Sequence, residues 1–270
     1  MRRLVLLAVA VAQAAAASAV AQDIKLPPPQ TIFPGVSFSS GLDYSAGRYG
    51  DNHDTDILVG LTNITVSEDD FQFSASLPYL NITGPAYVVV GPGGAPVLIN
   101  PAKGTDSTVR SGWGDLNFSA SYTLPSDAVD DFEITGTFRT KIATANASKG
   151  LSTGATDFAF SVDVSKQFDA WGPFATFAYR VPGEPSFYSF NDAPSFSVGT
   201  SIELADNVVA IGSYDFDGSI STSLADAQQL FGSVTWLATD KLSLTAYFEN
   251  GLSSGAPRVG TGLLISWKVN

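Results

Sequence analysis

Six charged side chains fall where they could act together on a small solute. They are Asp115, Arg139, Lys141, Arg180, Asp215 and Glu249. Each stands on the polar face of a segment in which polar and apolar residues alternate. Acidic and basic groups on opposite walls of a narrow passage would orient a small polar or amphipathic molecule. The same charges could instead pair with one another and fill a polar interior, because buried charges need partners. The sequence leaves both alternatives open.

The stretch from Ser111 to Ala145 shows the alternating pattern most clearly. Its first run has an apolar face formed by Leu116, Phe118, Ala120, Tyr122 and Leu124. Its second run has an apolar face formed by Phe132, Ile134, Gly136, Phe138 and Ile142. Each run has about ten residues, which is enough for a tilted β-strand to cross a bilayer.

The rest of the chain repeats this unit and contains about twelve strand candidates. Their approximate ranges are 36–46, 55–66, 71–82, 112–124, 131–144, 157–166, 172–181, 194–204, 207–217, 227–237, 241–250 and 258–269. Short turns alternate with longer loops rich in Gly, Ser, Pro and Asn, which is typical of outer-membrane barrels. Unpaired backbone groups are costly in lipid, so the first and last strands should pair. The predicted fold is all-β: a closed, antiparallel, up-and-down transmembrane β-barrel.

The aromatic residues on the apolar faces are expected to form two belts, one near each end of the barrel. One belt comprises Phe71, Tyr122, Phe132, Trp171, Trp236 and Trp267, and the other comprises Tyr44, Tyr79, Tyr179, Phe216 and Phe248. Such belts mark the two headgroup levels of a membrane. Segment 55–66 is ambiguous, because Ile57, Val59 and Leu61 compete with Leu58, Ile64 and Val66 for the lipid face.

The N-terminus has the features of a secretory leader. Met1-Arg2-Arg3 precedes an apolar run that ends at the small-residue pattern Ala19-Val20-Ala21. We predict a cleaved signal peptide over residues 1–21, a proline-rich periplasmic lead-in over 22–35, and the barrel over 36–270. The proline-rich part could alternatively form a plug inside the barrel.

Composition excludes several classes of function. The formal net charge is −12, and removal of Arg2 and Arg3 with the leader takes it to −14. A surface this acidic disfavours nucleic acid, which is bound through Lys and Arg. The chain has no cysteine, so it has neither thiolate zinc sites nor thiol catalysis. No cofactor and no metal site is expected, because the acidic loops lack the spacing of a dedicated calcium site.

Two loops leave alternatives open. Loop 83–111 begins with apolar residues and could fold inward, cap the mouth, or remain an exposed surface loop. His53 is the only histidine and lies beside Asp51 and Asp54. It could belong to a Ser–His–Asp arrangement of a lipid hydrolase, but a solvated loop histidine is the preferred interpretation, and the chain is not expected to be an enzyme.

Two motifs resemble a known family. Leu77-Pro78-Tyr79 is followed, after a long loop, by Ser111-Gly112-Trp113-Gly114-Asp115 and then by Tyr122-Thr123-Leu124. This combination resembles the outer-membrane family named for the MetA pathway of phenol degradation. The resemblance implies a transporter-like barrel in the outer membrane of a Gram-negative bacterium, with small hydrophobic or aromatic compounds as solutes.

The leading hypothesis is an outer-membrane channel or uptake protein for passive transport of small molecules. Its partners would be outer-membrane lipids, the solute and, during biogenesis, periplasmic chaperones and the barrel-assembly machinery. The alternative is a structural or surface-interaction barrel with a plugged lumen.

Overall fold

A computed structural model of the protein describes residues 35–49, 51–91, 96–98, 106–125, 132–185, 188–221 and 224–269. The predicted signal peptide, and the lead-in up to residue 34, lie outside these ranges. Among the described residues, no helix has the length and hydropathy needed to cross a bilayer.

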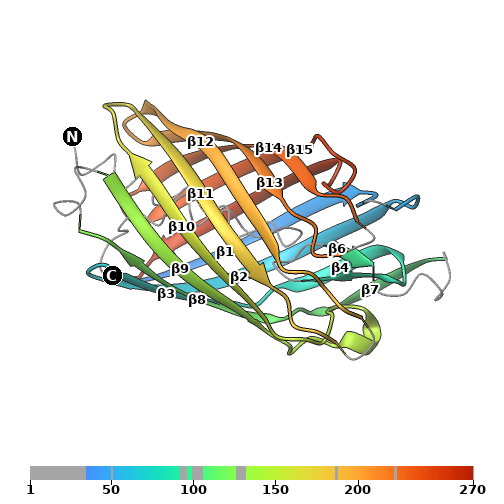
Figure 1. The fold of residues 1–270 in the computed structure, drawn as a ribbon. Helices are drawn as coiled ribbons and strands as arrows, with labels where there is room; N and C mark the ends of the chain where they lie inside the picture. The colour runs from blue at the N-terminus through green and yellow to red at the C-terminus, as the bar shows by residue number, and fades with distance from the viewer. Residues whose placement is uncertain are drawn as a thin grey trace.

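The described chain forms one closed antiparallel sheet (Figure 1). Its strands are β1 (Gly35–Gly47), β2 (Thr55–Glu68), β3 (Phe71–Ser76), β4 (Tyr79–Pro85), β7 (Ser107–Trp113), β8 (Leu116–Thr123), β9 (Phe132–Ile142), β10 (Asp157–Lys166), β11 (Trp171–Val181), β12 (Ala193–Ala205), β13 (Val208–Asp217), β14 (Ala227–Thr239), β15 (Leu242–Gly251) and β16 (Val259–Lys268). β3 with β4, and β7 with β8, each form one broken strand. The barrel wall therefore has twelve strand positions, which we call staves. β1 pairs with both β2 and β16, so no edge remains. The predicted fold is confirmed.

The two broken staves are interrupted side by side. β3 and β4 are separated by Leu77-Pro78, and β7 and β8 by Gly114-Asp115. Proline cannot donate a ladder hydrogen bond, but the Gly114 amide donates to the Pro78 carbonyl at 2.8 Å. A side chain at position 114 would meet the Pro78 ring at 2.8 Å. Glycine therefore allows the close approach that keeps the wall continuous across the break.

The two faces of the strands are sorted as predicted. On β10, Phe158, Phe160 and Val162 are 43 to 53% exposed, whereas Asp157 and Asp163 on the inner face are at most 3% exposed. The predicted belts also point outward. The ambiguity in β2 is resolved, since Leu58, Ile64 and Val66 face outward and Ile57, Val59 and Leu61 are buried inside the barrel.

The connections give the barrel two unlike ends. Short turns join β2 to β3, β10 to β11, β12 to β13 and β14 to β15, and we call this the short-turn end. The other end, the long-loop end, carries the connection between β4 and β7. This connection contains a small hairpin of β5 (Val88–Val90) and β6 (Pro96–Leu98).

The exposed apolar wall predicts a depth-dependent cost of charge. Val162 lies mid-strand, and Leu204 lies near the short-turn end; both are about half exposed on the outer face. Val162→Arg should lower the free energy of unfolding from lipid vesicles by about 2–4 kcal/mol, and Leu204→Arg by about 0–1 kcal/mol. Denaturant titration of the reconstituted protein measures both, and equal costs would contradict a bilayer around this wall.

Candidate functional site

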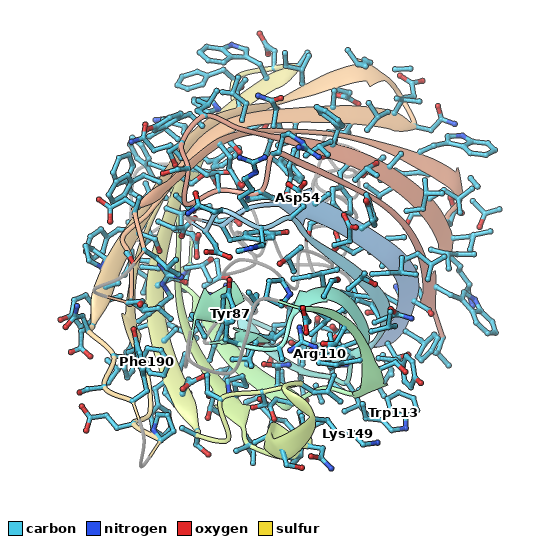
Figure 2. All side chains as sticks on the ribbon, turned by 90° about the vertical axis from the view of Figure 1, so that its right-hand side faces the viewer. Asp54, Tyr87, Arg110, Trp113, Lys149 and Phe190 are labelled. Atoms are coloured by element: carbon cyan, nitrogen blue, oxygen red, sulfur yellow. The ribbon has the colours of Figure 1, made fainter. Side chains whose placement is uncertain are left out.

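The β5–β6 hairpin lies across the mouth of the barrel at the long-loop end. Figure 2 looks into this end and shows Tyr87 and Arg110 within the ring of strands, while Trp113 points away from it. Val88 and Val89 are almost completely buried. Of the alternatives for loop 83–111, the inward fold applies to the hairpin with its buried residues 87–90 and Val97, whereas residues 106–109 of the same loop are exposed.

Apolar contacts hold the hairpin on two sides of the mouth. On one side, Val90 packs into a cluster on the inner face of β2 and β4, formed by Tyr49, Ile57, Val59, Leu61, Leu80, Ile82 and Leu151. On the other side, Val89 and Val97 pack against Phe190, Ala193 and Ile220. The hairpin therefore spans the mouth between β2 and the loops that precede β12 and follow β13.

Arg110 fixes the start of the hairpin. Its guanidinium donates to the carbonyl oxygens of Val88 at 2.7 Å, Pro85 at 3.1 Å and Ala86 at 3.3 Å. Arginine presents several donors in a rigid planar group, so one side chain on β7 holds three carbonyl groups within the four residues from Pro85 to Val88. This contact positions the hairpin without a carboxylate.

A second anchor joins the hairpin to the first loop at this end. The Tyr87 hydroxyl donates to Asp51 Oδ2 at 2.5 Å and lies 3.2 Å from His53 Nδ1. Burial alone would raise the pKa of Asp51, but hydrogen bonds from Tyr87, Asn52 and His53 outweigh it, and the pKa is lowered. Burial and the Asp51 carboxylate raise the pKa of Tyr87 to about 12. Asp51 is therefore ionised and Tyr87 protonated at neutral pH, which is the combination that this hydrogen bond requires.

The ring of His53 is tied to the same pair. Its Nδ1 atom lies 3.1 Å from Asp51 Oδ2. Within the described ranges, its side-chain partners are Asp51 and Tyr87 and do not include a serine, so the arrangement here is not a Ser–His–Asp triad.

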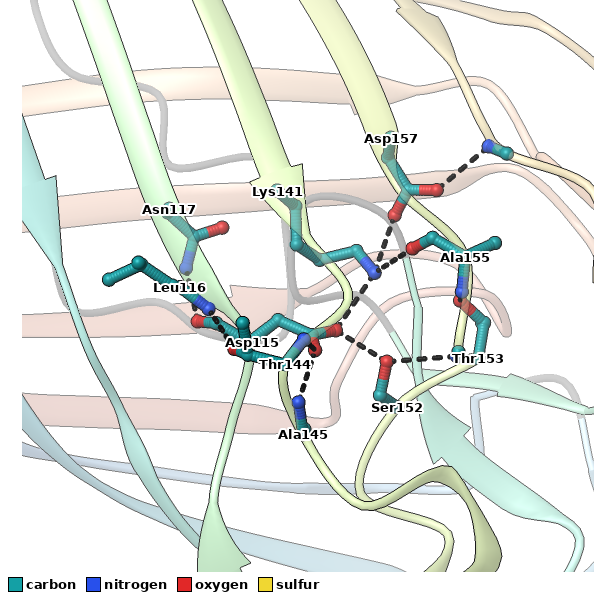
Figure 3. A network of polar contacts seen from close by, with 12 residues as sticks. Asp115, Leu116, Asn117, Lys141, Thr144, Ala145, Ser152, Thr153, Ala155 and Asp157 are labelled. Atoms are coloured by element: carbon teal, nitrogen blue, oxygen red, sulfur yellow. Dashed lines mark hydrogen bonds and ion pairs between the residues drawn. The ribbon is translucent and has the colours of Figure 1, made fainter.

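Inside the barrel, Asp115 and Lys141 meet as the centre of a buried network (Figure 3). Asp115 lies at the break between β7 and β8, where its Oδ1 accepts from the amides of Thr144 and Ala145 at 2.9 and 2.8 Å. Its Oδ2 accepts from Lys141 Nζ at 2.9 Å and also from the Ser152 hydroxyl. The carboxylate thus ties the barrel wall to the loop that follows β9.

Lys141 completes this network. Its Nζ also lies 2.8 Å from Asp157 Oδ2 and donates to the Ala155 carbonyl at 2.9 Å. The ammonium group thus donates hydrogen bonds to Asp115 and Ala155 and forms ion pairs with Asp115 and Asp157. Asp157 in turn accepts from the Gly183 amide at 2.8 Å. The network therefore fixes β9, β10 and two loops to one another.

The other predicted lumen residues occupy separate contacts. Arg139 donates to the Ser161 hydroxyl at 3.2 Å. Arg180 donates to the Gly218 carbonyl at 2.8 Å and lies 3.7 Å from Asp217. Asp215 accepts from the hydroxyls of Ser197 and Ser213. Glu249 is buried on the inner face of β15. All six face inward, and their role toward a solute stays a prediction.

Sequence reasoning missed three inner acidic residues: Asp43, Asp157 and Asp217. Each is at most 4% exposed. The alternation of inward- and outward-facing residues along each strand, which we call parity, predicts an inward position for them. Asp43 lies between the outward-facing Leu42 and Tyr44, and Asp157 precedes the outward-facing Phe158. What parity could not supply is the partner of each charge.

Comparison with known proteins shows the fold. No protein-family model matches the chain, and no curated protein matches it in sequence. Among solved structures, it is similar to the KdgM porin, with 8% identity, coverage of 87% of this chain and 99% of that chain, and a TM-score of 0.53. It is also similar to the translocator domain of the autotransporter NalP from Neisseria meningitidis, with 8% identity, coverage of 87% of this chain and 88% of that chain, and a TM-score of 0.55. A third similar structure is the β domain of the Bordetella autotransporter Brka, with 12% identity, coverage of 87% of this chain and 100% of that chain, and a TM-score of 0.54.

These three structures place the chain among outer-membrane β-barrels by fold. The same architecture serves a porin and two autotransporters, so function has to be argued from the lumen. The resemblance to the MetA-pathway family stays a prediction.

The Lys141 network makes a prediction about stability. Lys141→Met keeps the length of the side chain but leaves Asp115 and Asp157 buried without their shared cation, which should cost about 3–5 kcal/mol. Arg48→Met is the matched control, because Arg48 forms only a solvent-exposed pair with Asp54 at 3.4 Å and should cost about 0–1 kcal/mol. The free energy of unfolding in vesicles measures both, and a neutral Lys141→Met would show that the network does not hold the barrel.

Proposed function

We propose that the chain is an outer-membrane channel through which small molecules diffuse passively. The observation that carries the proposal is the charged and polar inner face of a closed twelve-stave barrel. An eight-stranded barrel is nearly filled by its own side chains, and a sixteen-stranded porin leaves a wide aqueous pore. Twelve staves enclose an intermediate interior, and Ser161, Ser197 and Ser201 are among the small residues on its inner face.

The mouth supports small hydrophobic or aromatic compounds as the solute class. The apolar cluster on the inner face of β2 and β4 lies in contact with Val90 of the hairpin. If the hairpin moves away, this cluster becomes an apolar entry surface beside the polar interior. An amphipathic or aromatic solute could pass from one surface to the other. The Leu77-Pro78-Tyr79 and Gly112-Trp113-Gly114-Asp115 motifs support the same class through the family that they resemble.

The proposal includes the route to the membrane. The leader over residues 1–21 would direct the chain to the periplasm, where chaperones and the barrel-assembly machinery would receive it.

A second candidate is a structural or surface-interaction barrel with a plugged lumen. It is favoured by the same hairpin, which packs on both sides of the mouth, and by the Asp115–Lys141–Asp157 network, whose charges satisfy one another. In this candidate the hairpin stays in place and the long loops meet a partner.

Solute flux separates the two candidates. Purified protein in liposomes should give swelling rates above protein-free vesicles when sugars, amino acids and aromatic acids are compared, with the aromatic acids fastest for their size. Stable single-channel steps in planar bilayers should accompany the swelling. Absence of both swelling and steps would reject the channel and leave the plugged barrel.

A single substitution tests whether the hairpin limits flux. Val89→Asp places a charge in the apolar contact with Phe190 and Ile220, where burial without a partner is costly, so the hairpin should undock and conductance should rise several-fold. Val109→Asp is the matched control, because Val109 is 70% exposed. An unchanged conductance of Val89→Asp would show that the hairpin does not narrow the path.

A further inference from the structure

Four carboxylates gather on one part of the inner wall, on β1, β13 and β15. They are Asp43, Asp215, Asp217 and Glu249, each at most 4% exposed. The charged groups that act on Glu249 are the other three carboxylates. Of the inner cations, Lys141 is held by Asp115 and Asp157, and Arg180 lies 3.7 Å from Asp217. We call this group of four the acidic wall.

Two glycines on β16 bring the members of this wall together. Gly260 and Gly262 stand at alternate positions of the inner face, opposite Glu249 and Tyr247 of β15. A side chain at position 260 would meet the Glu249 carboxylate at 2.7 Å, and one at 262 would overlap the Tyr247 ring. Without side chains there, Tyr247 reaches across β16 and donates its hydroxyl to Asp43 Oδ2 on β1.

The wall contains buried acceptors that lack donors. Within the described residues, Asp43 Oδ1 is a buried acceptor without a hydrogen-bond partner, and neither a hydrogen bond nor a cation is among the influences that act on the Glu249 carboxylate. Three neutral atoms share this state: Ser195 Oγ, Gln229 Oε1 and Ser233 Oγ. Their residues lie directly opposite Asp217, Asp215 and Tyr247 in the strand register. Buried polar atoms are normally satisfied, so four such atoms on neighbouring strands of one wall point to a ligand.

The chemistry of the ligand follows from what the wall offers. A buried carboxylate such as that of Glu249, whose charged neighbours are other carboxylates, is stabilised by positive charge. Among the described residues, no cluster of three or more acidic, His or Cys side chains is arranged to hold a metal ion. Aromatic rings border the wall: Tyr247 carries the bond to Asp43, and Phe231 lies 5.8 Å from the Tyr247 ring. Tyr49 lies within electrostatic reach of Asp43 and Glu249. Carboxylates bordered by aromatic rings suit an ammonium group, which is attracted to both.

We propose that the acidic wall of β1, β13 and β15 binds a small organic cation carrying an ammonium group, with Glu249 as its main counter-charge. The inference rests on the proposed channel function and names a solute class for it. The apolar mouth would admit the organic part of such a solute, and the wall would take its charged end. Ser195, Gln229 and Ser233 would orient it through their unpartnered atoms.

Calorimetric titration with choline chloride tests the site directly. Full-length mature protein in detergent micelles, at neutral pH and constant ionic strength, should bind choline saturably. Glu249→Gln keeps the shape of the side chain and should weaken binding by at least about tenfold, because truncating a buried charge partner costs several kcal/mol. Glu68→Gln is the control with the same change of charge, since Glu68 is exposed at the short-turn end, and it should bind like the native chain.

Three results would overturn the inference. They are the absence of choline binding, equal affinity in Glu249→Gln, and displacement of choline by an equal concentration of potassium, which would show a site for inorganic cations only. Asp43→Asn serves as a second variant, and circular dichroism confirms that each variant has kept its β-sheet. Binding in micelles needs no current, so a silent barrel that binds choline rejects the channel alone, whereas a conducting barrel that does not bind it rejects the site alone.

Discussion

Hydrocarbon offers no hydrogen bonds, and the structure depends on that constraint. Every backbone N–H and C=O of a strand that faces lipid must be paired within the protein. The chain meets this condition by pairing β1 with β16 over ten residues, from Ser37 with Lys268 to Ala46 with Val259. Closure leaves no edge strand, and it commits every alternate residue to one of two environments. The side-chain pattern of the sequence is the consequence of closure, since a register slip of one residue would exchange the two faces.

Closure also creates an interior in which charges cannot be left to bulk water. Two different solutions are visible there. Around Lys141, each charge has a partner, and the ammonium is shared by two carboxylates and a carbonyl. Around Glu249, carboxylates face carboxylates. A fully satisfied polar network rigidifies the wall that contains it, whereas an unsatisfied one is costly and calls for a partner from outside. We therefore assign the first a structural role and propose the second as the ligand site.

The sequence predicts the staves well because their signal is local. The ranges 157–166 and 55–66 correspond to β10 and β2 within two residues, since alternation and turn residues act over short distances. The same local signal fails on the inner face of β2. Ile57, Val59 and Leu61 are apolar yet point inward, because they pack against Val90 of the hairpin. That contact joins residues about thirty positions apart and has no signature in either segment. The hairpin itself was visible only as an apolar run in a loop, whose destination the sequence does not encode locally.

The candidate site shows the same limit in another form. Parity placed Asp115, Lys141, Asp215 and Glu249 inside, but inner position alone does not distinguish a charge that stabilises the wall from one that meets a solute. The neighbouring residues distinguish the two kinds of charge. Asp115 forms an ion pair with Lys141 on the adjacent stave, while the Glu249 side chain extends over Gly260 toward β1. Glycine at two alternate positions of β16 is thus as decisive as the acid itself, because a larger residue there would separate Glu249 and Tyr247 from Asp43. The chemistry of this lumen is set as much by where side chains are absent as by where charges are present.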